Sequence, residues 1–347
     1  MKTEDILSRG YFPKELPPPF GTASFAAAVV AGSVQLPLRP PATSTLRHNL
    51  ARVGSLRRGL GIPNPLSYHC LAEFICANWG MFHGAAVASQ FSMSRPKATP
   101  GTSRAIVPIQ PFSGWPLARV RARPGRRYLL RADINLFYSS IYTHSVPWAL
   151  HTKILAKAQQ RDTGLKGNEL DRLLRNLNDK QTIGIPIGPD VSLLVAEILL
   201  SSVDIGFGTG RLTSGARYLD DYEFSFSTLA ETEQGLADLQ GALAEFELTL
   251  NPAKCAIEEL PRPLEAPWVA ELRSFRLADK SRKQGNDLIS FFTKAFVVAR
   301  MYPQEPVLKY AIGRVAALKV APSNFSLYQS LLLQTASGEA VSYTHLT

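Results

Sequence analysis

The order of secondary-structure elements expected after Arg127 constrains the fold more than any other feature. Tyr128–Asp133 is a short apolar run that ends in an acid, as expected of a buried strand. Residues 216–226 alternate on both sides of two central acids, which predicts a hairpin with the acids at its bend. Around these segments the sequence predicts helices over 139–158, 167–178, about 190–203 and 229–247, and a further strand over 249–258.

This order is the β-α-β-β-α-β pattern of ferredoxin-like sheets, and it predicts an α+β fold. It places Asp133 at the end of the first strand and Asp220 and Asp221 in the bend between the two central strands. Those two places are adjacent in such a sheet. We therefore expect the three carboxylates to lie within one metal shell, although they are remote in the sequence.

Carboxylates on neighbouring strand ends are what phosphoryl transfer with two magnesium ions requires. Each Mg²⁺ prefers oxygen ligands, and two ions about 3.5–4 Å apart activate an attacking hydroxyl and stabilise the leaving pyrophosphate. An exposed Asp-Asp turn is the plain alternative for such a pair. The apolar residues Leu219, Phe224 and Phe226 beside the bend argue against a merely solvated turn.

Positive charge is concentrated in the first third of the chain. Residues 1–130 hold 16 Lys and Arg against 4 Asp and Glu, whereas the whole chain holds 38 against 28 and has a net charge of +10. A basic region of this kind suggests a polyanionic partner. Arginine suits bidentate phosphate contacts, so we expect nucleic acid to bind here. The candidate contacts are Arg104, Arg119, Arg121, Arg123, Arg126 and Arg127, and no acid separates them from one another or from Arg131.

Several other functional classes lack their sequence patterns. Three cysteines without a Cys-x-x-Cys pair and six scattered histidines predict no zinc site, and free thiols fit a reducing, cytoplasmic environment. No P-loop motif is present, and the glycines of 206–210 follow a helix rather than a strand, which disfavours a dinucleotide loop. No apolar run is long enough and free enough of charge to predict a membrane span.

Five segments resemble the motifs of reverse transcriptases, and they occur in that family's order. Tyr218–Asp221 resembles the Tyr-x-Asp-Asp signature, and Asp133–Tyr138 resembles motif A, which has an aromatic residue five positions after the acid. Gly184–Ser192 resembles motif B, Leu250–Lys254 is similar to motif D, and Arg57–Pro63 looks like the fingers segment that precedes them. Each segment alone is a weak signal, whereas five in order are a strong one.

The resemblance implies a right-hand polymerase core whose palm contains the ferredoxin-like sheet. The final segment follows no helical pattern, and we interpret it as a non-native tail or the end of a truncated chain. The implied divisions are an N-terminal arm over 1–34, fingers over 35–126, a palm over 127–260 with a fingers-side insertion over 150–182, a thumb or start of a helical region over 261–338, and the tail over 339–347.

The resemblance also implies roles for individual residues. Asp133 and Asp220 would be the main ligands of two Mg²⁺ ions, for which Mn²⁺ can substitute, and Asp221 would be a weaker ligand. Tyr138 would stack beneath the incoming sugar and select deoxynucleotides, and Lys254 would protonate or neutralise the departing pyrophosphate. The remaining nucleotide contacts would come from Ile134, Gly184, Pro186 and Gly188, and from Arg58 on the triphosphate.

The form of motif B points to one group within the family. Gly184–Asp190, with Ile187 where most reverse transcriptases carry glutamine, resembles the bacterial defence-associated and abortive-infection group, as does the proline-rich opening Tyr11–Phe20. The resemblance therefore implies an RNA-directed DNA polymerase in antiphage defence, located in the cytoplasm. Its partners would be an RNA template, dNTPs and a DNA product. A non-coding RNA is a further candidate partner, a homo-oligomer is compatible with the sequence, and no membrane is involved.

Three alternatives use the same residues. The site could synthesise DNA without a template or from a protein primer, since several members of the resembled group need no ordinary primer. The chain could instead be an inactive nucleic-acid-binding scaffold, although all three acids are intact. An RNA-dependent RNA polymerase is disfavoured by Tyr138, because an aromatic ring there would clash with a 2′-hydroxyl.

Overall fold

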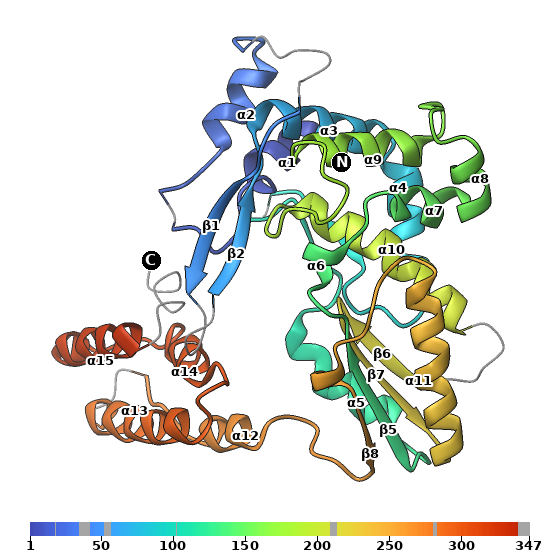
Figure 1. The fold of residues 1–347 in the computed structure, drawn as a ribbon. Coiled ribbons are helices and arrows are strands. Elements are labelled where there is room, and N and C mark those ends of the chain that lie inside the picture. The colour runs from blue at the N-terminus through green and yellow to red at the C-terminus, as the bar shows by residue number, and fades with distance from the viewer. Residues whose placement is uncertain are drawn as a thin grey trace. The chain divides into compact units, whose positions relative to one another are not determined.

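The computed structural model combines helices and strands, in agreement with the α+β expectation (Figure 1). The chain divides into two compact units, each of which has its own hydrophobic core. The first unit comprises residues 1–14, 21–47 and 61–262, and the second comprises 15–20, 48–60 and 263–347. The structure describes residues 1–17, 19–34, 42–51, 57–101, 103–208, 214–279 and 283–338.

A four-stranded antiparallel sheet is the main sheet of the first unit. Its strand order is β6-β7-β5-β8, and helices lie between β5 and β6 and between β7 and β8 along the chain. The chain therefore follows the expected β-α-β-β-α-β sequence of elements. The strands are β5 (Tyr128–Asp133), β6 (Ser214–Tyr218), β7 (Asp221–Phe226) and β8 (Ala256–Glu259).

The last strand differs from its prediction. We expected it over 249–258, but β8 begins only at Ala256. Pro252 cannot donate to a strand ladder, and it starts a single 3₁₀ turn, Pro252–Lys254, in which the Ala253 N–H donates to the Asn251 side chain. The turn carries Lys254 to the end of the sheet where β5 finishes.

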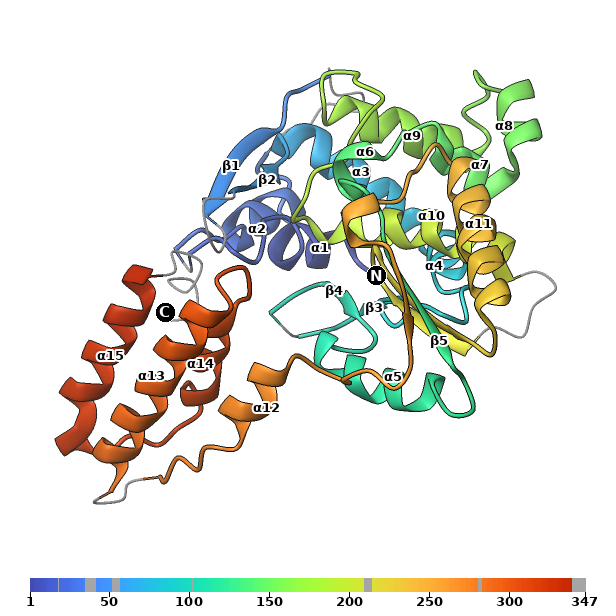
Figure 2. The same cartoon turned by 60° about the horizontal axis from the view of Figure 1, so that its bottom comes forward.

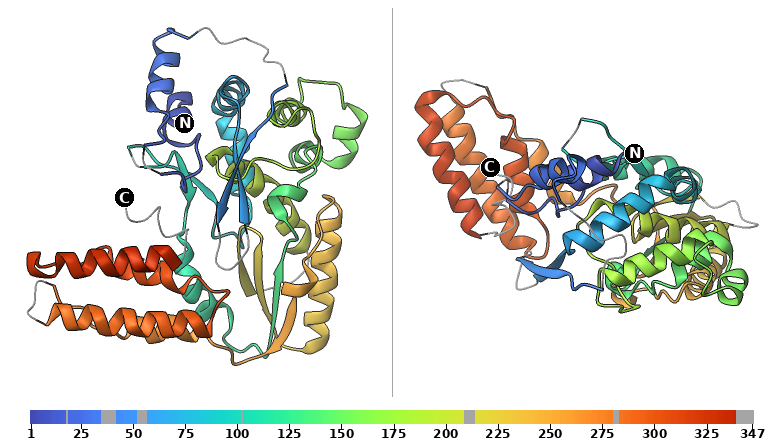
Figure 3. Two further views of the ribbon diagram at one scale, coloured as in Figure 1. Left: turned by 60° about the vertical axis from the view of Figure 1, so that its left-hand side comes forward. Right: turned by 90° about the horizontal axis from the view of Figure 1, so that it is seen from above.

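Helix α11 (Leu229–Ala244) packs against β5 and β7 on one side of the sheet (Figure 3). It begins with a capping box, in which the Thr228 hydroxyl accepts the Glu231 N–H and the Glu231 carboxylate accepts the Thr228 N–H. Phe224 of β7 packs against the ring of Phe207, with centroids 4.7 Å apart. These contacts fix the strand that begins at Asp221 against the core.

Helix α10 (Asp190–Gly208) runs through the core of the first unit and is buried on most of its surface. We expected it to end near residue 203, but it continues because Asp204 is paired inside the core and Phe207 is buried. By length and composition alone α10 is apolar enough to cross a membrane, yet 72% of that span is buried within the protein. Core helices pass the same test, so this is weak support for a membrane segment.

The stretch expected as one helix over 139–158 forms three short helices instead. Tyr142 leaves helical geometry to bridge with Ile183, and Thr152, with φ of 74°, separates the last two helices. The next expected helix, over 167–178, is present as α9 (Lys166–Asn176). The three short helices are α6 (Phe137–Ser140), α7 (Ser145–His151) and α8 (Lys153–Ala158).

The N-terminal arm is integrated into the first unit, since Ile6 and Leu7 are fully buried in its core. Between residues 92 and 118 two short strands form, and a helix begins at Trp115 and continues into the arginine-rich stretch. The elements before the main sheet are α1 (Thr3–Arg9), α2 (Ala23–Val30), β1 (Leu46–Ala51), β2 (Arg57–Ile62), α3 (Pro65–Ala77), α4 (Trp79–Ala86), β3 (Pro96–Ala98), β4 (Ile106–Pro108) and α5 (Trp115–Ala122).

The second unit is largely helical (Figure 2). Its helices are α12 (Pro267–Arg273), α13 (Gln284–Met301), α14 (Val307–Val315) and α15 (Phe325–Gly338). Phe291 and Phe292 of α13 are fully buried in its core. Pro303 and Pro306 lie between α13 and α14, where neither helix can include them in its interior. The division into arm, fingers, palm and thumb stays a prediction, and the tail over 339–347 lies outside the described residues.

Candidate active site

The structure brings the three predicted acids to one end of the main sheet. Asp133, the last residue of β5, lies directly opposite Asp221, the first residue of β7. The Ile134 N–H donates to the Asp220 carbonyl at 3.1 Å, so the strand end and the bend stay joined beyond the ladder. The strand order alone predicts this meeting.

The bend between β6 and β7 contains a left-handed residue. Leu219 has φ of 53°, a conformation that costs free energy for a residue with a β-carbon. Its N–H donates to Ser94 Oγ at 2.7 Å, and its carbonyl accepts from Arg217 Nη1 at 3.1 Å. Both polar backbone groups of Leu219 are therefore bonded to neighbouring side chains, and the two acids follow directly.

The acids at this edge repel one another. Burial and the carboxylates of Asp220 and Asp133 raise the pKa of Asp221 to about 7, and the Lys254 ammonium opposes this shift. Asp221 as a whole residue keeps an exposed surface at the first position of β7, although its carboxylate lies among protein atoms, so water screens only part of the repulsion. The excess of acids over cations here is what a bound cation would relieve.

Lys254 is the cation that the structure pairs with this cluster. Its Nζ donates to Asp133 Oδ2 at 2.7 Å, and this bond raises the pKa of the lysine. The neighbouring Asn251 N–H donates to the Asp133 carbonyl at 2.8 Å, which docks the 3₁₀ turn against the end of β5. A role for Lys254 toward pyrophosphate stays a prediction.

The residues present fit a hard divalent cation in their chemistry. Asp133, Asp220 and Asp221 supply only oxygen donors, which Mg²⁺ and Mn²⁺ prefer. Within the described ranges, no group of three or more His, Cys, Asp or Glu side chains is arranged to hold a metal ion. One of the oxygens is instead bonded to Lys254, so an ion at Asp133 would compete with that ammonium.

The motif A and motif B segments contact each other through their backbones. The half-buried Tyr138 accepts a hydrogen bond at its carbonyl from the Ile185 N–H at 2.9 Å. Gly184 has φ of 87°, and a β-carbon there would lie 3.2 Å from the Ser139 carbonyl oxygen. This position therefore suits glycine for conformational and steric reasons that need no ligand. A contact of Tyr138 or Gly184 with nucleotide stays a prediction.

Pro186 and Gly188 also make close contacts with other parts of the chain. Pro186 is buried, and its carbonyl accepts the Ser192 hydroxyl at 2.6 Å. Gly188 has φ of 126°, and a β-carbon there would lie 2.4 Å from Pro13 of the arm. Ile134 is buried as well. Arg58 is exposed on β2 and belongs to the second unit, and its contact with the triphosphate stays a prediction.

Most of the predicted nucleic-acid-binding arginines are engaged with other parts of the chain. Arg104 pairs with Asp190 and donates to the carbonyl of Phe12 at 2.7 Å. The remaining contacts are Arg119 and Arg123 with Glu223 at 2.9 and 2.8 Å, Arg127 with Glu259 at 3.0 Å, and Arg126 with the Ser227 hydroxyl at 3.0 Å. Arg121 is exposed on α5.

The sequence analysis missed a buried charge cluster behind the bend. Arg217 of β6 is fully buried between Glu197 and Asp204 of α10. Burial alone would lower the pKa of Arg217, but the two carboxylates raise it well above its ordinary value. The available signal was the presence of two acids seven residues apart in an otherwise apolar helix, since buried acids need a paired cation.

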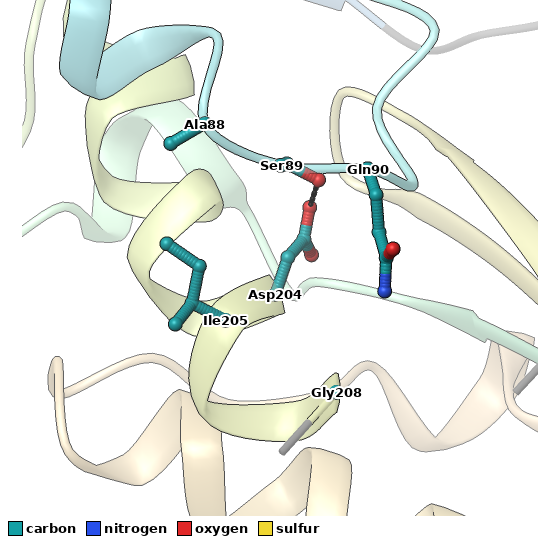
Figure 4. A pocket seen from close by; sticks show the side chains of 6 residues that line it. All are labelled: Ala88, Ser89, Gln90, Asp204, Ile205 and Gly208. Carbon is teal, nitrogen blue, oxygen red and sulfur yellow. Dashed lines mark hydrogen bonds between the residues drawn. The ribbon is translucent and has the colours of Figure 1, made fainter. Parts of the chain in front are cut away.

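An open pocket of about 240 Å³ lies beside Asp204, at the C-terminal part of α10 (Figure 4). The Ser89 hydroxyl donates to the Asp204 carboxylate at its edge. Because Asp204 is already bonded to both Ser89 and Arg217, the pocket offers little unused hydrogen-bonding capacity from this carboxylate. The residues that line it are Ala88, Ser89, Gln90, Asp204, Ile205 and Gly208.

No protein-family model matches the chain, and no curated protein matches it. Among solved structures, the chain is similar to apo telomerase from Candida tropicalis, with a TM-score of 0.47 and 9% identity, covering 93% of this chain and 67% of that one. It is also similar to telomerase from Candida albicans in complex with a TWJ fragment of telomeric RNA, with a TM-score of 0.41 and 10% identity, covering 94% of this chain and 66% of that one. Similarities at this level carry no conclusion about function.

Proposed function

We propose that the chain is an RNA-directed DNA polymerase that adds deoxynucleotides with the help of two Mg²⁺ ions. The observation that carries the proposal is the register that sets Asp133 opposite Asp221, with Asp220 in the adjoining bend. The order of the five motif segments along the chain supports it independently. The RNA template, the dNTPs and the DNA product are part of the same proposal.

Each residue has a distinct task in this proposal. Asp133 and Asp220 hold the ions, and Asp221 adds a weaker ligand. Bound Mg²⁺ supplies charge that stabilises the phosphates and lowers the pKa of an attacking hydroxyl. Lys254, which bonds Asp133 in the resting chain, is released to deliver a proton or positive charge to the departing pyrophosphate. Tyr138 supports the deoxyribose.

Incorporation of labelled dNTPs on an RNA template with an annealed DNA primer tests the proposal. Asp133→Asn and Asp220→Asn should each lower kcat by about 10³-fold, because metal binding supplies several kcal/mol of charge stabilisation. Glu233→Gln, which neutralises an exposed acid on α11, is the matched control and should leave kcat unchanged. Full activity in both aspartate variants would contradict the proposal.

The products separate this function from its alternatives. Sequenced DNA that copies the supplied RNA supports templated synthesis, whereas DNA unrelated to it indicates template-independent or protein-primed synthesis. Incorporation of rNTPs in preference to dNTPs would indicate an RNA polymerase. RNA binding without incorporation in Mg²⁺ or Mn²⁺ would indicate an inactive scaffold. The defence role rests on the form of Gly184–Asp190, and protection of cells against phage that is lost in Asp220→Asn would support it.

A further inference from the structure

The buried cluster behind the bend is a closed set of charges. Arg217 directs Nε to Asp204 Oδ2 at 2.9 Å, and its Nη1 and Nη2 bond Glu197 Oε1 and Oε2 at 2.9 and 3.0 Å. All three side chains are at most 1% exposed. A bidentate arginine flanked by two carboxylates is directionally fixed, and any movement of the guanidinium breaks charged hydrogen bonds in a dry environment.

Arg217 of this cluster, and Ser94, which is bonded to Glu197, both reach the bend that carries the acids. Arg217 Nη1 donates to the Leu219 carbonyl at 3.1 Å. Ser94 Oγ donates to Glu197 Oε1 at 2.7 Å and accepts the Leu219 N–H at 2.7 Å. The left-handed residue of the bend is thus bonded on both its N–H and its carbonyl to groups that are themselves fixed by Glu197.

We propose that Ser94 and Arg217 are positioning residues, which hold the Leu219 bend so that Asp220 and Asp221 stay beside Asp133 at the sheet end, where the proposed ions would bind. This inference rests on the proposed function. The bend does not adopt a relaxed conformation by itself, because Leu219 has a positive φ and its polar backbone groups need partners. Neither positioning residue touches the ions or the substrate. Each acts through the backbone of Leu219.

Ser92 provides an internal comparison for Ser94. Both hydroxyls are buried and both donate to Glu197, Ser94 to Oε1 at 2.7 Å and Ser92 to Oε2 at 2.8 Å. Only the Ser94 hydroxyl accepts the Leu219 N–H. Ser94→Ala and Ser92→Ala therefore remove the same chemical group and the same type of bond to Glu197, but only the first leaves the bend without its partner.

The first test measures metal binding and the bend directly, without nucleotide. Mn²⁺ is titrated into each full-length variant, and free Mn²⁺ is followed by electron paramagnetic resonance, while amide hydrogen exchange is followed in peptides covering 218–221. Ser94→Ala should weaken Mn²⁺ binding by about tenfold, equivalent to about 1.4 kcal/mol, and accelerate exchange at the bend. Ser92→Ala should bind Mn²⁺ within about twofold of the unchanged chain, with unchanged exchange. The melting temperatures of the two variants should fall by similar amounts.

The second test separates positioning from a general loss of folded protein. In primer extension, Ser94→Ala should lower kcat at fixed Mg²⁺ with little change in the KM for dNTP, and raised Mg²⁺ should restore part of the rate. Equal Mn²⁺ affinity, equal exchange and equal kcat in the two serine variants would overturn the positioning role. A wild-type chain that binds no Mn²⁺ and incorporates no nucleotide would overturn the proposed function itself, and the positioning role with it.

Discussion

The hairpin of β6 and β7 joins two acidic clusters that differ in how their carboxylates are paired with cations. On the buried side, Glu197 and Asp204 share one arginine, and each carboxylate is bonded to it and to serine hydroxyls. At the sheet end, three acids gather around Lys254, whose side chain is 60% exposed. In the buried cluster one rigid, fully buried arginine bonds both carboxylates, whereas the cation at the sheet end is a largely exposed lysine.

The difference indicates what each cluster is for. Unmatched acids inside a protein cost free energy, so a cluster that serves the fold alone is expected to carry its own compensation. In the Arg217 cluster both carboxylates are bonded to the guanidinium, although burial still raises the pKa of Asp204. In the Asp133 cluster the lysine is bonded to Asp133 and mostly exposed, and burial together with the carboxylates of Asp220 and Asp133 raises the pKa of Asp221 to about 7. Clusters of this second kind are candidates for function.

The largest expected effect is on the buried side. Arg217→Met should lower the free energy of unfolding by about 3–5 kcal/mol, because it leaves two buried carboxylates without their cation. Urea unfolding followed by circular dichroism measures this change. Asp220→Asn should leave the unfolding free energy unchanged or raise it, because it removes repulsion at the other end of the hairpin. Equal decreases in the free energy of unfolding of the two variants would contradict the proposed difference between the clusters.

An intermediate effect is expected at Lys254. Lys254→Ala should lower the rate of primer extension by about 10²-fold if the lysine serves as the proton donor. The unfolding free energy should change by less than about 1 kcal/mol, since the side chain is mostly exposed. Single-turnover kinetics with a matched Lys97→Ala control, which alters an exposed lysine on β3, measures the rate. An unchanged rate in Lys254→Ala would contradict a role as proton donor and would leave Lys254 only its structural bond to Asp133.

The smallest expected effects distinguish paired from exposed arginines on α5 and just beyond it. Arg123→Ala should destabilise the fold by about 1–3 kcal/mol, because it leaves the buried Glu223 with one partner fewer, and it should not alter RNA affinity. Arg121→Ala should leave stability unchanged and reduce the slope of log affinity against log salt by about 0.7. Filter binding across a salt series measures the slope. Identical slopes for the two variants would contradict the prediction that Arg121 contacts RNA phosphates.

Much of the fold around the acids could be predicted from the sequence. The apolar run ending at Asp133 and the alternating flanks of Asp220 and Asp221 were enough to predict the strands, and the β-α-β-β-α-β order of the elements then placed these acids at one sheet end. The prediction of a helix over 139–158 was wrong, since Tyr142 leaves helical geometry for a bridge with the distant Ile183, and Thr152 adopts a positive φ that ends one helix and begins the next.

The partners of charged side chains were harder to predict. The arginines between residues 104 and 127 have no acid near them in the sequence, yet Arg104 meets Asp190 and both Arg119 and Arg123 meet Glu223 once the chain is folded. Net charge over a segment does not indicate which guanidinium groups remain available. The support of the Leu219 bend by Ser94 was unpredictable for the same reason, since it depends on a loop brought in from far along the chain.

The packing of Pro13 against Gly188 gives the N-terminal arm a structural role beyond covering the core. Tyr11, which stacks on Tyr68 and donates to the Pro63 carbonyl, anchors the arm two residues earlier. The arm therefore packs through Pro13 against Gly188 in the loop that precedes α10. Removing or displacing the first fourteen residues would increase the mobility of that loop. The rate of proteolysis in the loop would then report whether the arm is bound in place.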